Sequence, residues 1–302
     1  MIRDPVEWLG RATPVEWLGR ATPHRYVVVD VFTPRPLEGN QLGVFLDGRP
    51  LSSEVMLRLT RELNFSETIF LLPPMFGGDA AVRIFTPGGE LPFAGHPVLG
   101  AAFVVATARE ADSVVLETGA GPVPVHLEWS EGRVAFGRMW QPVPTWEPFR
   151  HQDELLSAVG AKASALPIEA YRNGPVHVFI RLPGERAVGE LRPDMARLTD
   201  LGVAVSCFAG RGDTWKTRMF FPAGGVPEDP ATGSAAGPLA VHLARHREIA
   251  FGQEIEIRQG GELNRPSLLY AKVTGDRERV ESVEVGGHAQ IVAEGAFRTG
   301  DA

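Results

Sequence analysis

The sequence predicts an α+β protein of two domains, in which many strands surround one central helix in each half. Three observations support this prediction. The chain has 302 residues, which exceeds the usual ~100–200 residues of a single domain. Short apolar or alternating runs bounded by Gly and Pro recur along the whole chain, as is typical of strands. Each half also contains one Gly/Ala-rich helical segment, whose small side chains would let strands pack closely around it.

The N-terminal segment is a tandem repeat that precedes this pattern. The nine residues PVEWLGRAT of Pro5–Thr13 recur without change as Pro14–Thr22. Two copies of this length are too short for a solenoid, in which several larger units must stack to bury a core. We therefore assign residues 1–23 to an N-terminal extension without a site residue. A docking arm that uses Trp8 and Trp17 is the alternative.

The first half opens with two apolar strands, YVVVDVF and LGVFLDG, on either side of a Pro/Gly-rich turn, which predicts a hairpin. Helical spacing and a Ser-rich start predict a helix over Leu51–Asn64. Strands are predicted in ETIFLLPP and AVRIFTPGGELPF, a helix in AGHPVLGAAFVVATARE, and further strands in SVVLETGAGPVPVHLEWSEGRVAFGRM.

The Pro/Trp-rich stretch Gln141–Pro148 is the best linker candidate. The predicted domains therefore cover residues 24–140 and 141–302, and the last ~15 residues are a candidate addition to the first domain. Helices are expected near Asp153–Val159 and Pro193–Leu201. The second half has strands in VHVFIRL, VAVSCFAG, TWKTRMFFP, QEIEIRQGG, SLLYAKVTG and VESVEVGGHAQIVAEGAF.

The two central helices begin alike. Gly95-His96 and Gly233-Ser234 each place a polar side chain beside a glycine at the start of a helix, which indicates a weak internal duplication. Unpaired N–H groups and the helix dipole attract carboxylates to such N-termini, and glycine allows close approach. Facing each other, the two helix starts would form an anion site.

Composition and charge exclude several classes of protein. A formal charge of −7 disfavours nucleic acid and anionic membranes, because phosphate contacts need clustered Lys and Arg. No apolar stretch approaches the ~18–20 residues that span a bilayer, and no secretory signal is visible, so we expect a cytoplasmic protein. Cys207 is the only cysteine, which excludes a disulfide within the chain and a zinc site built on several thiolates. We expect it to be buried and structural.

Several segments together carry a resemblance to a known family. LNFSETIFLLPP, RIFTPGGELPFAGHPVLGAA and PEDPATGSAAGPLA occur in this order, with VDVFTPRPLEGNQLGVFLDG before them and QGGELNRPSLLYAKV after them. From about Tyr26 to about Phe297, the chain resembles the PhzF family of phenazine-biosynthesis-like isomerases. The resemblance implies a diaminopimelate-epimerase-like fold: two pseudo-symmetric domains, each a mostly antiparallel β-structure wrapped around a central helix, with the site in the cleft between them. It also implies a homodimer that needs no metal and no organic cofactor.

Residue by residue, the resemblance places the family's acid/base glutamate on Glu67 of SET and its cleft histidine on His96 of GHP. The family's aspartate and serine fall on the EDPATGS segment. Val98 departs from the family, which commonly has threonine after GHP, and this difference puts one substrate hydrogen bond in doubt. The candidate catalytic residues are Glu67, His96 and Asp229, and the candidate substrate-binding residues are Ser66, Gly95, Gly233 and Ser234.

With these matches, the resemblance implies a cofactor-independent isomerase or epimerase that moves a proton within a small carboxylated substrate, with Glu67 as general acid and base. The single cysteine cannot supply the thiol pair of cysteine-dependent racemases. The alternative function is a non-catalytic small-molecule or protein-binding member of the same fold.

Structural interpretations of the same residues remain open at this point. Glu67 could be a solvated carboxylate at a strand edge, and His96, Asp229 and Ser234 could serve as helix caps. His242 and His246 lie one helical turn apart, but Leu243 takes the place of the glutamate in the H-E-x-x-H zinc motif. We therefore expect the two histidines on a surface helix face.

Overall fold

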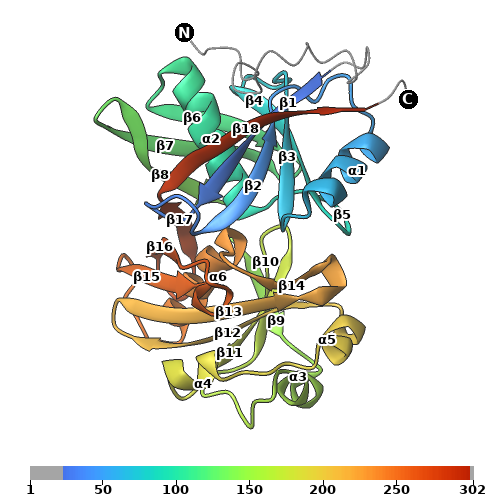
Figure 1. Ribbon diagram of the computed structural model, residues 1–302. Coiled ribbons are helices and arrows are strands. Elements are labelled where there is room, and N and C mark those ends of the chain that lie inside the picture. Colours follow the sequence, from blue (N-terminus) through green and yellow to red (C-terminus); the bar gives the residue numbers. More distant parts are fainter. Residues whose placement is uncertain (1–22, 300–302) are drawn as a thin grey trace.

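The computed structural model describes residues 23–299 (Figure 1). The tandem repeat over Pro5–Thr22 lies outside the described residues. All strands of the described part are hydrogen-bonded into one continuous sheet, which curls around the helices α2 (Gly95–Arg109) and α6 (Gly233–Arg245). The predicted α+β class with one central helix in each half is confirmed.

The first half follows the predicted order of elements and opens with the predicted antiparallel hairpin. The helix predicted over Leu51–Asn64 spans Ser53–Leu63, because the Ser52 hydroxyl accepts the Val55 N–H at one end and Asn64 adopts a left-handed conformation at the other. The elements are β1 (Pro23–Val31), β2 (Asn40–Phe45), α1 (Ser53–Leu63), β3 (Glu67–Leu72), β4 (Ala80–Thr86), β5 (Gly89–Leu91), α2, β6 (Ser113–Thr118), β7 (Gly121–Ser130) and β8 (Arg133–Gln141).

The second half contains shorter elements that the sequence patterns did not predict, among them β9 (Thr145–Pro148), α4 (Glu185–Gly189) and β14 (Val226–Asp229). The predicted linker Gln141–Pro148 includes the end of β8 and all of β9, so only residues 142–144 lie between them. The elements are β9 (Thr145–Pro148), α3 (Gln152–Val159), β10 (Glu169–Arg172), β11 (Val176–Arg181), α4 (Glu185–Gly189), α5 (Met195–Leu201), β12 (Ala204–Arg211), β13 (Thr214–Phe221), a 3-10 helix (Pro222–Gly224), β14 (Val226–Asp229), α6, β15 (Glu254–Gln259), a 3-10 helix (Gly261–Leu263), β16 (Ser267–Gly275), β17 (Val280–Gly287) and β18 (Ala289–Arg298).

Strand pairing shows that the two halves are duplicates of one topology. In the first half, β1 and β2 are antiparallel, β2 and β3 parallel, β3 and β4 antiparallel, and β4 and β6 parallel. The second half repeats this sequence of pairings in β10, β11, β12, β13 and β15. In both halves a short strand, β5 or β14, pairs with the fourth strand and leads into the central helix. The two domains are therefore pseudo-symmetric.

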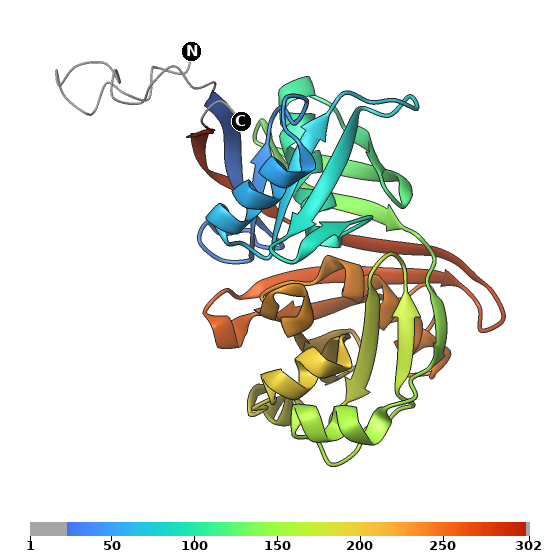
Figure 2. The same ribbon diagram turned by 90° about the vertical axis from the view of Figure 1, so that its right-hand side faces the viewer.

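The ends of the chain tie the halves together. β18 returns to the first half and pairs with β1, as β9 pairs with β10 in the second (Figures 1 and 2). β17 pairs with β8, which joins the two parts of the sheet. The exact domain boundaries at residues 23, 140 and 302 stay a prediction.

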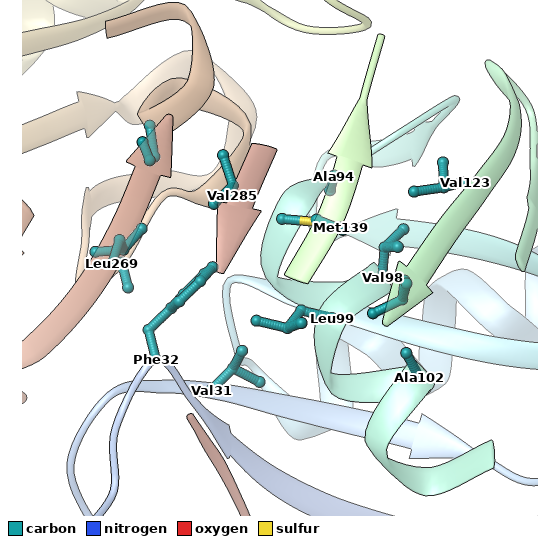
Figure 3. Close-up of a cluster of buried hydrophobic side chains, with 14 of the residues drawn as sticks. Val31, Phe32, Ala94, Val98, Leu99, Ala102, Val123, Met139, Leu269 and Val285 are labelled. Carbon is teal, nitrogen blue, oxygen red and sulfur yellow. The ribbon is translucent and has the colours of Figure 1, made fainter. Parts of the chain in front are cut away.

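Both central helices are surrounded by strands, because their many small residues leave room for close packing. All residues from Gly95 to Ala106 and from Gly233 to Ala244 are buried. Val98, at the position where the PhzF family commonly has threonine, is a core residue together with Leu99 (Figure 3). Its side chain offers no hydrogen bond.

Phe32 links the two parts of the core. Its ring lies among Leu99, Leu269 and Val285 (Figure 3). A Cβ atom at Gly233 would lie 2.9 Å from the Cζ atom of Phe32. Phe32 also has a φ of 65°, which is rare for a bulky residue. The ring therefore supports the start of α6 from the side of β1.

Cys207 lies on β12 and is buried, as expected. Burial raises the pKa of its thiol to about 12, which keeps the thiol protonated and unreactive at neutral pH. Within residues 23–299, none of the helices combines the length and the apolar character needed to cross a bilayer.

Candidate active site

The N-termini of α2 and α6 touch each other. A Cβ atom at Gly95 would lie 2.4 Å from the backbone nitrogen of Ser234, and one at Gly233 would lie 3.0 Å from the backbone nitrogen of His96. Only glycine permits this approach. Because first-turn N–H groups have no acceptor within their own helix, both helices direct donors and positive dipole ends to one place.

The polar residues at these helix starts are not caps. The N-cap positions are Ala94 in α2 and Thr232 in α6, and neither side chain caps its helix. His96 and Ser234 are the second residues of their helices, and Asp229 ends β14. The capping interpretations of these three residues are therefore wrong.

Asp229 is the centre of a buried hydrogen-bond network that links the halves. Its Oδ1 atom accepts hydrogen bonds from Asn40 Nδ2 at 2.8 Å and from the Ser66 hydroxyl at 2.7 Å. Its Oδ2 atom accepts one from the Thr232 hydroxyl at 2.6 Å. Burial raises the pKa of Asp229, whereas these hydrogen bonds from Thr232, Ser66 and Asn40 oppose the rise. The network holds Asp229 in one orientation.

Glu67 begins β3 and faces the same region. Only 14% of its side chain is exposed, and its Oε2 atom lies 3.6 Å from His96 Nδ1. Burial, and then the nearby Asp229 carboxylate, raise the pKa of Glu67 well above its usual value. Glu67 is therefore not a solvated strand-edge carboxylate, and a carboxyl tuned in this way is typical of general acid/base groups.

His96 is a neutral partner in this site. Only 2% of it is exposed, and burial lowers its pKa to about 3. Asn40 Nδ2 lies 3.3 Å from its Nδ1 atom. The Nε2 atom of His96 and the Oε2 atom of Glu67 are buried without a hydrogen-bond partner among the described residues. Buried polar atoms usually have partners, so both atoms are available to a polar ligand.

The internal duplication identifies the counterpart of Glu67. In the parallel pair β2–β3, Leu42 is opposite Glu67, and in the equivalent pair β11–β12, His177 is opposite Ala204. Glu67 and Ala204 are each the first residue of their strand. Alanine cannot transfer a proton, so at this position of the duplicated topology only the first half carries an ionisable side chain.

The first turn of α6 is held by side chains from β8 and from the turn between β10 and β11. Pro238 has no N–H, so the Ser234 carbonyl cannot receive the usual helical hydrogen bond. Asn173 Nδ2 donates to that carbonyl at 3.1 Å instead. Gln141 Nε2 donates to the Gly233 carbonyl at 2.8 Å, and its own carbonyl oxygen accepts from Asn173. The start of α6 is therefore held by side-chain hydrogen bonds from outside the helix as well.

His177 of β11 contacts the Ser234 side chain, with 3.0 Å between Nε2 and Oγ. It is 2% exposed, and burial lowers its pKa to about 4 from the usual 6.5. Between these two pH values the unfolded chain binds this proton more strongly than the folded protein does. The stability due to His177 is therefore present above pH 6.5 and is lost as the pH falls toward 4.

This difference predicts a pH dependence of stability. Between pH 6.5 and 4, the wild-type protein should lose about 3 kcal/mol more unfolding free energy than His177→Gln, at about 1.4 kcal/mol per pKa unit. Urea unfolding of both proteins at several pH values measures this. Parallel pH profiles would show that His177 does not titrate differently in the folded state.

The structure thus brings together all seven predicted site residues, and it adds others. Asn40, Thr232 and Gln259 lie within segments that carry the family resemblance, and Gln259 Nε2 donates to the Asp229 carbonyl at 2.7 Å. Gln141, Asn173 and His177 lie in segments without a motif, so nothing in the sequence pointed to them.

His242 and His246 differ from the expectation. His242 is fully buried, because α6 is a central helix with strands around it, so the predicted surface helix face is wrong. Its ring stacks on Phe179, with 5.6 Å between the ring centroids. Both histidines surround Glu169, whose Oε2 atom is 3.3 Å from His242 Nδ1 and 3.0 Å from His246 Nε2.

This group has the residue types of a metal site, but its charges are already balanced. Arg245 Nη1 donates to Glu169 Oε2 at 2.8 Å, and the Tyr171 hydroxyl donates to the same atom at 2.9 Å. The histidine, arginine and tyrosine hydrogen bonds hold the pKa of Glu169 well below its usual range against the effect of burial. A divalent cation would add two uncompensated charges beside Arg245, which is costly in a buried place. We interpret the group as a hydrogen-bond network.

Comparisons with known proteins agree with this fold. A family model described as "Phenazine biosynthesis-like protein" (PhzC-PhzF) matches residues 29–295. Trans-2,3-dihydro-3-hydroxyanthranilate isomerase of Pseudomonas aeruginosa is 54% identical over 273 residues, which cover 90% of this chain and 98% of that protein.

Two solved structures show the same fold. A phenazine biosynthesis protein of the PhzF family from Bacillus anthracis has a TM-score of 0.80 at 24% identity, with 92% of this chain and 100% of that chain covered. A hydroxyproline epimerase from Agrobacterium vitis has a TM-score of 0.64 at 14% identity, with 91% of each chain covered. The family match and the 54% identical relative show that the chain belongs to the PhzC-PhzF family of phenazine biosynthesis-like proteins and is an isomerase.

Proposed function

We propose that this chain isomerises trans-2,3-dihydro-3-hydroxyanthranilate or a closely similar cyclic amino acid, and that Glu67 moves the proton. The relative that is 54% identical to this chain bears this substrate in its name. The observation that carries the proposal is the Glu67 carboxyl, which has a raised pKa and lies near the meeting point of two helix N-termini.

The substrate's chemistry suits a single acid/base group. Its name describes a ring that retains two double bonds, with a carboxylate, an amino group and a hydroxyl group. The hydroxyl-bearing carbon lies next to the two double bonds, which are conjugated with each other and with the carboxylate. Removal of the hydrogen on this carbon as a proton leaves a charge spread over the diene and the carboxylate. Return of a proton to another ring carbon gives an isomeric enol, which tautomerises to a ketone.

Glu67 would perform both proton transfers. A raised pKa makes its carboxylate a stronger base toward a carbon acid, and the protonated carboxyl can then return the proton. Ala204 fills the equivalent position in the second half, so a second base is not supplied from there. Removal and return of the proton would therefore occur on one face of the ring, unlike a racemisation with a base on each side.

The helix starts would bind the substrate carboxylate. The N–H groups at Gly95, Gly233 and Ser234 lie where the two positive dipole ends meet, which favours an anion. His96 and Asp229 would orient the ring relative to Glu67. A bound polar ligand would also provide a partner for His96 Nε2, which is buried and unpaired.

The test is turnover of the proposed substrate in ordinary and heavy water. We expect conversion to a product of the same mass in ordinary water, enzyme-dependent deuterium incorporation at carbon in heavy water, and no change when a chelator is present. Activity that disappears with the chelator and returns with a metal would contradict the cofactor-free mechanism. Binding without conversion would favour the non-catalytic alternative for this substrate. The homodimer implied by the resemblance stays a proposal, which sedimentation can test.

A further inference from the structure

The contact between His177 and Ser234 has a preferred direction. His177 Nε2 lies 3.0 Å from Ser234 Oγ, and the other ring nitrogen, Nδ1, is buried without a partner among the described residues. Because its pKa is lowered by burial, the ring is neutral and carries one N–H at neutral pH. That hydrogen sits either on the nitrogen facing Ser234 or on the nitrogen that has no partner.

An unpaired buried N–H is rarer and costlier than an unpaired acceptor. The favoured tautomer therefore has its hydrogen on Nε2 and donates it to Ser234 Oγ. Since the serine oxygen accepts from His177, its own hydrogen is free to be donated elsewhere. Ser234 is only 6% exposed, so little water competes to accept that hydrogen.

The backbone around Ser234 is held in place as well. Asn173 donates to the Ser234 carbonyl, and Gln141 to the Gly233 carbonyl. The serine can therefore adjust little by moving its main chain, and the direction of its hydroxyl depends on His177.

We propose that His177 is a positioning residue that makes the Ser234 hydroxyl a hydrogen-bond donor to the substrate carboxylate at the start of α6. This inference rests on the proposed function, which places that carboxylate there. It assigns a role in substrate binding to β11, a strand of the second half that does not carry any of the predicted site residues.

A double-mutant cycle tests the proposal, with 3-hydroxyanthranilate as the probe. This compound is the aromatic counterpart of the relative's substrate, so its binding does not depend on turnover. Calorimetry should show about tenfold weaker binding to His177→Leu and to Ser234→Ala, the size of one hydrogen bond. The double variant should bind about as weakly as each single variant, because both changes remove one donor.

Rescue separates positioning from packing. His177→Gln retains an N–H donor near the place of Nε2 and should bind the probe nearly as well as the wild type, although its packing differs. Ser206→Ala is the matched control, since Ser206 is a buried hydroxyl on the adjacent strand, opposite Phe179 in the register. We expect no change in probe affinity for this variant. In the substrate assay, His177→Leu should raise KM more than it lowers kcat.

Nitrogen-15 NMR of the histidine rings reads the tautomer directly, and we expect a neutral ring with its hydrogen on Nε2. A hydrogen on Nδ1, additive losses in the cycle, or undiminished binding to His177→Leu would each overturn the role of His177 and leave the proposed function intact. A wild-type protein that isomerises the substrate but does not bind the probe would likewise overturn the carboxylate contact. Absence of both binding and turnover would reject the proposed function itself.

Discussion

Glu67→Gln is expected to lower turnover by about a hundred- to ten-thousand-fold, the usual contribution of general acid/base catalysis. Glutamine keeps the size and much of the hydrogen bonding of the glutamate but cannot accept and return a proton. Affinity for 3-hydroxyanthranilate should change little, because the proposed carboxylate site is at the helix starts and does not include Glu67. Turnover, deuterium exchange and calorimetry on the same preparations measure the separate effects.

Two other variants serve as a control and as a comparison for this result. Glu90→Gln changes an exposed glutamate on β5 that pairs with Arg83, and its turnover should stay near that of the wild type. Asp229→Asn should be milder than Glu67→Gln if Asp229 orients the ring without transferring the proton. Near-normal deuterium exchange in Glu67→Gln would show that the base is elsewhere and would make Asp229 and His96 the candidates.

Gly95→Ala is expected to reduce both stability and turnover. The new Cβ atom would lie 2.4 Å from the backbone of Gly233 and Ser234, and no side-chain rotation can relieve a contact with main-chain atoms. Overpacking costs about 1–3 kcal/mol, and alanine regains at most about 1 kcal/mol through its helix propensity. We expect about 2 kcal/mol less unfolding free energy and, because the helix starts must separate, about a hundredfold lower turnover.

Urea unfolding and the substrate assay test this prediction, with Gly261→Ala as the control. A Cβ atom at Gly261 would meet nothing within 4 Å, so this variant should retain stability and turnover. If Gly95→Ala is as stable and as active as the wild type, the contact between the two helix starts is not needed for the site.

Much of the architecture could be predicted from local sequence patterns. Apolar runs between Gly and Pro marked most strands, and the Ser52 cap marked the start of α1. The Gly/Ala-rich composition of α2 and α6 indicated that strands surround them, as the burial of both helices confirms. The SET, GHP and EDPATGS motifs indicated the candidate site residues, because they occur along the chain in the same order as in the family that it resembles.

Other features could not be predicted from local patterns. His242 was expected on a surface helix face, yet it is buried, since its helix lies at the centre of a domain. β9 and β14 are too short to show a period. Gln141, Asn173 and His177 stand in unremarkable segments and become relevant only through their contacts with α6.

The sequence alone therefore determined the α+β class, the paired central helices and the motif residues, because periodicity, glycine content and residue order are local properties of the chain. The tertiary structure decided which groups meet and what their surroundings do to them. Asp229 accepts a hydrogen bond from Asn40, 189 residues away, and the pKa of Glu67 is raised by burial and by Asp229. Desolvation and Coulomb energies depend on distances in space, and those distances exist only once the two halves have folded together.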